Sequence, residues 1–405
     1  MMKSRSDRFA RHFPESLEHP RTIGREAEFP VVHADGTAAD VRPILQTLFA
    51  QGGLEAKREG DLITGLDSPG AEYSLEVGWG TVEVITGPHA DLHALKQAHE
   101  AATARVVAAA AQHDAFVLGV GTQPITPGTP ALLSPKERYK VLLDTLGELW
   151  LWFTVTASDQ VHVDTCLSEL ASLTHLANAC APVTVALCAN SPLHGGQPTG
   201  FASSREGFMG RIEGIGGRHG MPAEPVVSVE AWIEHLCRQP FLIDKVEGVY
   251  SPGDGRPFSE HPDPSWERFL VHEHYCWNSG RPRAAISTLE WRAACQQPPD
   301  EHMAAAALQL GLTEAAPTVA CLLDEVGWPG LRAWHEQTVR EGFCEPRRGL
   351  LADIVAACEE GLAARGLGEE VYLGAVHKRV ERREAPAAET LRRWQDGSLV
   401  QARAH

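Results

Sequence analysis

The sequence lacks the features that mark several common classes of protein. Its nine cysteines form no C-x-x-C pair, so reduced thiols are expected, as in a cytoplasmic protein, and most of them should be core residues. No apolar run is long enough to span a membrane, and the N-terminus has no apolar signal core. Basic residues are also few. There are 36 lysines and arginines against 53 acids, and this net charge of −17 argues against binding along a nucleic-acid backbone.

Familiar nucleotide-binding and hydrolase motifs are missing as well. There is no Walker A sequence and no G-x-S-x-G, and the L-G-V-G-T segment at 118–122 has too few glycines for a dinucleotide-binding turn. The segment H-E-H-Y-C leaves one other kind of site open. If it is a strand, His272, His274 and Cys276 would share a face and could bind a transition metal. That site would predict a hydrolase that works without ATP, but it lacks the second ligand pair usual for zinc.

The order of apolar patterns predicts an α+β fold in three parts. Residues 1–20 are expected to form a flexible arm or a short surface helix, 21–299 a core of strands and helices, and 300–405 a helical C-terminal region packed on that core. The expected strands lie at 22–33, 71–86, 115–121, 153–164 and 284–293, and the expected core helices at 39–51, 89–113, 135–150, 166–188, 204–213 and 228–239.

Four of the expected strands are apolar on one side and ionisable on the other, because residues two apart share a face. In 71–86, a four-residue hairpin loop at Val77–Gly80 would pair Ser74 with Glu83 and place Glu76 on the same face. The side chains that alternate with apolar residues in this way are Glu26, Glu28, Glu76, Glu83, Gln160, His162, Asp164, Glu290 and Arg292.

If these strands share one sheet, five glutamates and an aspartate meet on one surface. A solvated sheet face is the alternative for any single strand, although glutamate is a poor strand residue. Two carboxylates ~4 Å apart repel by ~4 kcal/mol at an effective dielectric of ~20, so a cation is needed. Hard oxygen ligands favour Mg²⁺ or Mn²⁺, which are commonly held together with nucleotide phosphates, and Arg292 could contact those phosphates.

Six segments of the sequence resemble, in order, those of the glutamate–cysteine ligases of plants and bacteria, within the carboxylate–amine ligases related to glutamine synthetase. They are G-R-E-A-E-F (24–29), S-L-E with T-V-E-V-I-T-G-P (74–88), S-P-K-E-R-Y-K (134–140), S-D-Q-V-H-V-D (158–164), A-N-S-P with G-Q-P-T-G-F-A-S-S-R (189–205) and T-L-E-W-R (288–292). The resemblance implies a curved antiparallel sheet whose concave face forms an active-site trough for ATP and Mg²⁺.

The resemblance also implies a role for each matching residue. The metal ligands would be Glu26, Glu28, Glu76, Glu83, Glu290 and His162, with His162 alternatively a phosphate contact. Nucleotide and phosphate contacts would be Arg292, Lys140, Arg138 and Gln160, and substrate contacts Arg205, Asn190 and Tyr139.

The expected activity is ATP-dependent joining of the glutamate γ-carboxylate to the amine of cysteine through an acyl phosphate. Arg292 and Glu83 would be catalytic, Asp164 would be the base that accepts the amine proton, and the loop at 213–220 could close over the site. Two further alternatives stay open. One is the same chemistry with another acid, amine or peptide, and the other is a non-catalytic binding protein with this fold.

Overall fold

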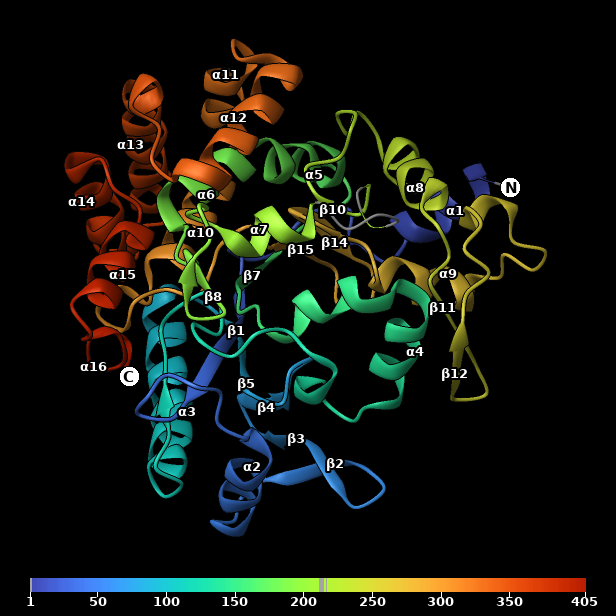
Figure 1. The fold of residues 1–405 in the computed structure, drawn as a ribbon. Coiled ribbons are helices and arrows are strands. Elements are labelled where there is room, and N and C mark those ends of the chain that lie inside the picture. The colour runs from blue at the N-terminus through green and yellow to red at the C-terminus, as the bar shows by residue number, and fades with distance from the viewer. Residues whose placement is uncertain (1, 211–214, 216) are drawn as a thin grey trace.

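The computed structural model describes residues 2–210, 215 and 217–405, and its centre is a nine-stranded sheet (Figure 1). The strands follow the order β14-β15-β7-β1-β5-β4-β3-β2, with β6 paired to β1, and all these pairs are antiparallel. The α+β class and the antiparallel sheet are therefore confirmed. The strands are β1 (Ile23–Val32), β2 (Glu55–Glu59), β3 (Leu62–Ser68), β4 (Ala71–Leu75), β5 (Thr81–His89), β6 (Phe116–Val117), β7 (Asp159–Asp164), β14 (Gly280–Arg283) and β15 (Thr288–Trp291).

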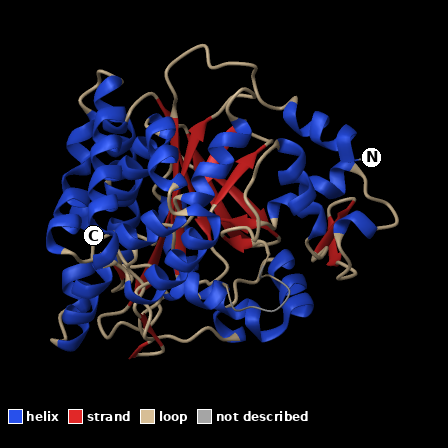
Figure 2. Cartoon of the chain, turned by 90° about the horizontal axis from the view of Figure 1, so that it is seen from above, coloured by secondary structure: helices blue, strands red, loops and turns tan. Residues whose placement is uncertain are grey.

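Helices surround this sheet, as the view from above shows (Figure 2). Several begin at a side-chain cap: Asp91 accepts a hydrogen bond from the backbone N–H of Ala94 at the start of α3, and Ser228 caps α8 in the same way. The helices up to residue 299 are α1 (Met2–Ala10), α2 (Val41–Ala50), α3 (Leu92–Ala111), α4 (Glu137–Leu146), α5 (Leu170–Ala179), α6 (Ala181–Cys188), α7 (Ser204–Met209), α8 (Val229–Arg238) and α9 (Trp266–His274).

The C-terminal region is helical, as expected, and it shares the main core with the sheet. Helix α10 is buried along most of its length, and it packs with α13 in one hydrophobic cluster that also contains Val161, Leu289 and Trp291 of the sheet. Its helices are α10 (Ala304–Glu314), α11 (Ala316–Asp324), α12 (Gly327–Glu341), α13 (Arg348–Ala364), α14 (Gly374–Arg382), α15 (Pro386–Gln395) and α16 (Leu399–Arg403).

The alternation of apolar and ionisable side chains along the strands gives the sheet one apolar face and one polar face. On one face, Ala27, Phe29 and Val84 are fully buried in a cluster with α2 and α3. On the other face lie the glutamates. The hairpin between β4 and β5 has the predicted register, because Ser74 pairs with Glu83 and the N–H of Glu76 donates to the carbonyl of Thr81 at 3.3 Å.

Some expected elements differ from the structure. Of the segment 284–293, only Thr288–Trp291 forms a strand, β15, which follows β14 after a turn in which Ser287 has a φ of 55°. The early part of 153–164 belongs to a 3₁₀ helix over Gly147–Thr154, and 115–121 contributes only β6. The alternative in which His272, His274 and Cys276 share a strand face is wrong, because His272 and His274 end helix α9. The hairpin β2–β3, which has little alternation in β2, was not expected from the sequence.

The N-terminal residues form a packed helix and not a free arm. In α1, Phe9 is fully buried and its ring meets Phe269 edge to face with centroids 6.3 Å apart. The guanidinium of Arg5 donates to the carbonyl of Pro264 at 2.8 Å. These contacts to α9 and the segment before it fix the helix. A short helix was one of the two alternatives expected for this region, but its burial against α9 was not expected.

Two further expectations can be checked directly. All nine cysteines are free thiols, and only Cys321 is exposed, so their expected place in the core is confirmed for the rest. Over residues 2–210, 215 and 217–405, no single helix has both the length and the apolar composition of a membrane span. Two bent pairs, α5 with α6 and Pro299–Glu314 with α11, reach that length and composition only together.

Candidate active site

A cavity of about 370 Å³ lies on the polar face of the sheet. Aromatic side chains of the segments opposite the sheet, among them Trp150, Tyr275 and Trp277, line its other wall. Nine of the residues predicted from the sequence line the cavity. They come from β1, β5, β7, α4, α7 and the segments next to β4 and β15, and they are Glu26, Glu28, Glu76, Glu83, Arg138, Tyr139, Gln160, Arg205 and Arg292.

Charge changes sign across this face of the sheet. Residues paired across the strands show the order: Arg281 of β14 lies opposite Glu290 of β15, and Glu28 of β1 lies opposite Glu83 of β5. The arginines Arg281, Arg283 and Arg292 therefore gather at the β14–β15 side, whereas the glutamates gather at β1, β5 and β4.

The glutamates on β1, β4 and β5 repel one another. Burial raises the pKa of Glu28 to about 7, and the neighbouring Glu76 adds to this rise. Burial, followed by repulsion from Glu76, Glu26 and Glu28, raises the pKa of Glu83 well above its ordinary value. A cation placed here would relieve that repulsion.

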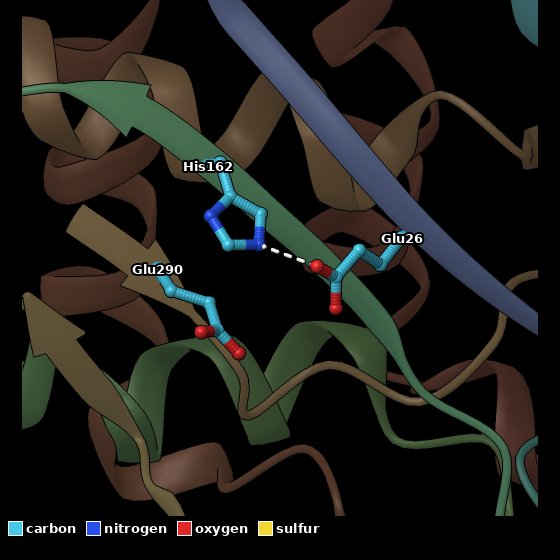
Figure 3. A group of neighbouring side chains, drawn as sticks. All are labelled: Glu26, His162 and Glu290. Atoms are coloured by element: carbon cyan, nitrogen blue, oxygen red, sulfur yellow. Dashed lines mark hydrogen bonds and ion pairs between the residues drawn. The ribbon is translucent and has the colours of Figure 1, made fainter. Parts of the chain in front are cut away.

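Glu26, His162 and Glu290 meet beside the cavity (Figure 3), and one ligand atom from each lies within 4.8 Å of the others. His162 Nε2 is 3.0 Å from Glu26 Oε1. Burial by itself would raise the pKa of Glu26, but His162 lowers it below its ordinary value. In the part of the chain that the structure describes, this is the only such group of three that could hold a metal ion, so His272, His274 and Cys276 do not form one.

Glu290 is already held by three guanidinium groups. It accepts from Arg281 Nε and Arg283 Nη1, each at 2.8 Å, and also from Arg292. Burial would raise its pKa, but these arginines lower it well below its ordinary value. A metal ion bound by Glu290 would therefore have to displace an arginine, whereas among the described residues no arginine donates a hydrogen bond to Glu28 or Glu83.

Polar contacts order the residues between the two charged sides. The amide of Gln160 donates to Glu28 Oε1 at 3.0 Å and its oxygen accepts from Arg292, so it links the acidic and basic halves. Arg205 Nη1 donates to Glu206 Oε1 at 2.7 Å. Arg138 donates to the hydroxyl of Tyr139 at 3.0 Å.

Five predicted site residues do not line the cavity: His162 and Glu290 lie beside it, whereas Asn190, Asp164 and Lys140 lie elsewhere. Asn190 is buried elsewhere, where its amide donates to the carbonyls of Gly119 and Gln296 at 2.9 Å. Asp164 lies at the end of β7, where it accepts from the N–H and hydroxyl of Thr22 at 2.8 Å and fixes the end of the strand, and it does not line the cavity. Lys140 is exposed on α4.

The buried cation of the α4 segment is Lys136, which lies four residues earlier. Its ammonium donates to the carbonyl of Leu75, and burial lowers its pKa to about 8, although Glu76 acts in the opposite direction. The two lysines of S-P-K-E-R-Y-K could not be told apart from the sequence. Of the expected closing loop at 213–220, residues 213, 214 and 216 lie outside the described part of the chain.

Arg281 and Arg283 were not expected at the site from the sequence. The signal was present in G-R-P-R, where two arginines alternate as in a strand, but the expected strand began at residue 284. His219 was missed as well, because it follows a glycine-rich segment with no periodic pattern. It lines the cavity beside Arg205.

Known proteins share both sequence and fold with this chain. A Rubrobacter xylanophilus protein, provisionally named glutamate–cysteine ligase 2-3, is 26% identical over 322 residues, which are 77% of this chain and 76% of that protein. The glutamate–cysteine ligase EgtA of Mycolicibacterium smegmatis is 28% identical over 205 residues, 48% of this chain and 47% of EgtA. A glutamate–cysteine ligase of Francisella tularensis, solved in complex with AMP, has a similar fold, with a TM-score of 0.56, 11% identity and coverage of 96% of this chain and 87% of that one.

These matches and the charged cavity on an antiparallel sheet define the class. The protein is an enzyme, an ATP-dependent carboxylate–amine ligase. Within that class, the chain belongs to the glutamate–cysteine ligase family 2, whose family model matches residues 22–405. The resemblance found from the sequence motifs is thereby confirmed.

Proposed function

We propose that the protein phosphorylates the γ-carboxylate of glutamate with ATP and then joins it to the amine of cysteine. The observation that carries this proposal is the change of sign across the cavity. Glutamates that repel one another lie beside arginines, and this arrangement suits a metal–triphosphate together with a carboxylate that is to be phosphorylated. The names of the relatives support the choice of substrates.

Mg²⁺, or Mn²⁺ in its place, fits the glutamate side of this cavity. Glu26, Glu28, Glu76 and Glu83 offer hard oxygen ligands on adjacent strands, and burial together with repulsion from neighbouring glutamates raises the pKa values of Glu28 and Glu83. His162 and Glu290 stay predicted ligands at the edge of this group. When bound, Mg²⁺ supplies charge neutralisation for the phosphates and polarises the phosphoryl group.

The side chains position the two chemical steps. A γ-carboxylate oxygen of glutamate attacks the γ-phosphorus of ATP, ADP leaves, and Arg292 stabilises the charge on the transferred group. Arg205 would bind a carboxylate of the substrate, with Tyr139 as a further substrate contact, and Arg138 and Gln160 would contact the nucleotide; all four line the cavity. The neutral amine then attacks the carbonyl carbon, the bond to the phosphate oxygen breaks, and inorganic phosphate leaves with the proton released to a base or to water.

Phosphate release from ATP tests this function. We expect release with Mg²⁺ only when glutamate and cysteine are both present, because the second step needs the amine. The assay is run over all pairs of the common amino acids, with Arg393→Ala, a change on the exposed face of α15, as the control. Phosphate release with a different pair of amino acids would identify that acid and that amine as the substrates in place of glutamate and cysteine. Absence of release with every pair, with Mg²⁺ and with Mn²⁺, would contradict it.

Stabilisation by Mg²⁺ should depend on pH. The pKa of Glu28 in the folded protein, about 7, is above its unfolded value, so the metal-free protein gains stability as the pH falls through this range and loses it as the pH rises. At pH 5.5 the metal must displace protons, whereas at pH 8 it relieves repulsion. We therefore expect MgCl₂ to raise the melting temperature more at pH 8 than at pH 5.5.

Differential scanning fluorimetry with and without MgCl₂ at the two pH values measures this effect. The Glu28→Gln variant should show a smaller difference between them, because one titrating ligand is gone. An equal rise in melting temperature at both pH values would show that protons and metal do not compete at this site.

A further inference from the structure

A second cavity, of about 350 Å³, lies between α7 and α12. His219 of the short strand β10 (His219–Gly220) lines both this cavity and the active-site cavity. The inner end of the second cavity contains Glu206, His219 and His335, and its outer end contains Arg332 and Arg340. The residues of α12 in its wall recur every three or four positions, so one face of that helix points into the cavity.

Glu206 is a buried carboxylate with spare hydrogen-bonding capacity. Only 2% of its side chain is exposed, and Oε1 accepts from Arg205. Oε2 has no hydrogen-bond partner among the described residues, and neither has the ring nitrogen of His335 that lies 3.6 Å from it. Burial would raise the pKa of Glu206, but His219, His335 and Arg205 lower it to about 2, so the group is ionised at neutral pH.

The ring of His219 can accept a hydrogen bond. His219 Nε2 lies 3.8 Å from Glu206 Oε1, and burial lowers the pKa of His219 to about 4, so this ring is neutral at pH 7. A primary ammonium has three donors, of which one fits Glu206 Oε2 and another the ring nitrogen of His219, while His335 Nε2 lies 3.6 Å from the same carboxylate oxygen. Arg332 and Arg340, both exposed at the outer end, provide charges that suit a carboxylate.

We propose that this second cavity binds the amine substrate as an α-amino acid, with its ammonium on Glu206, His219 and His335 and its carboxylate toward Arg332 and Arg340. The inference rests on the proposed ligase function and adds the location of the acceptor. The ammonium end would point to His219, which lines both cavities, so the nitrogen is brought to the wall of the reaction site. Arg205 and Glu206, adjacent in α7, then serve the acid and the amine respectively.

Hydroxylamine separates this inference from the function itself. It is neutral at pH 7 and attacks an acyl phosphate to give a hydroxamate and phosphate without an ammonium site. The measured quantity is kcat/KM for cysteine divided by the hydroxamate rate with glutamate and ATP. For Glu206→Gln and for His335→Asn, we expect this ratio to fall by about tenfold or more, through a higher KM for cysteine. His377→Asn, on the surface of α14, is the matched control and should leave the ratio unchanged.

The cysteine and hydroxamate rates distinguish a role of this cavity in binding the amine from a role in binding the acid. An unchanged ratio in both variants would overturn the assignment of the cavity. Equal losses of the hydroxamate and cysteine reactions, with a higher KM for glutamate, would assign Glu206 to the acid through Arg205 and also overturn it. If the unaltered enzyme makes no hydroxamate from glutamate and ATP, the proposed function fails first. Because His335 lies on α12 and does not contact Arg205 in the described structure, its variant remains informative if Glu206→Gln does not fold.

Discussion

Replacing Arg292 by alanine should reduce kcat by ~10³-fold or more while the protein stays folded. The guanidinium lies in the active-site cavity between Gln160 and Glu290, next to the position proposed for the transferred phosphate. Its removal takes away charge stabilisation that is strongest in the transition state. Glu290 would keep Arg281 and Arg283 as partners, so no unpaired buried carboxylate is created.

Steady-state phosphate release with saturating substrates measures the loss, and circular dichroism with the melting temperature checks the fold. Arg292→Lys should recover little of the activity, because an ammonium cannot contact Gln160 and a phosphate in the planar geometry of a guanidinium. We expect Glu83→Gln to cause a loss of similar size through weaker metal binding. Near-normal turnover in Arg292→Ala would show that the phosphate lies elsewhere in the cavity.

The second large effect is on stability, and it concerns Arg25 and Asp159. Both side chains are fully buried: Arg25 Nε donates to one carboxylate oxygen of Asp159 at 2.7 Å, and Nη2 donates to the other at 2.8 Å and to the carbonyl of His302 at 2.7 Å. Asp159→Asn removes the negative charge and leaves the guanidinium buried without its counter-ion. We expect this change to lower the free energy of unfolding by roughly 3–5 kcal/mol.

Urea unfolding at pH 7 measures this change. Glu389→Gln is the matched control, because it neutralises the acid of an exposed pair with Arg393 on α15, and it should cost less than ~1 kcal/mol. A loss below ~1 kcal/mol for Asp159→Asn would show that the site can relax or admit water. The pair also explains why an arginine lies on the apolar side of β1, since its partner reaches it from β7.

The fold class and the acidic face were predictable because they depend on local rules. Strand residues alternate in direction, so Glu26 with Glu28, and Glu290 with Arg292, had to share a face once each segment was a strand. The β4–β5 hairpin was predictable as well, because its loop length fixes the pairing of Ser74 with Glu83. Motif resemblance then provided the family, which the family model confirms.

Predictions failed where short segments depend on distant partners. Asn190 and Asp164 lie in motif-like segments, but hydrogen bonds to other loops and to Thr22 occupy their polar atoms. The residues 272–276 have no pattern that distinguishes a strand from a helix. The Ser265 cap and the burial of Phe269 stabilise helix α9, which therefore includes the first part of this segment. Such contacts join residues that are far apart in the sequence, so no local rule reveals them.

The sequence by itself therefore determined which side chains share a strand face, and with it the set of glutamates that calls for a cation. Only the tertiary structure decided the order of the strands, which places Arg281 and Arg283 beside Glu290 and separates them from Glu28 and Glu83. It also decided that His219 forms the wall between two cavities. The physical reason is that the direction of a side chain follows from the backbone geometry of its own strand, whereas its neighbours follow from the packing of strands and helices distant in the chain.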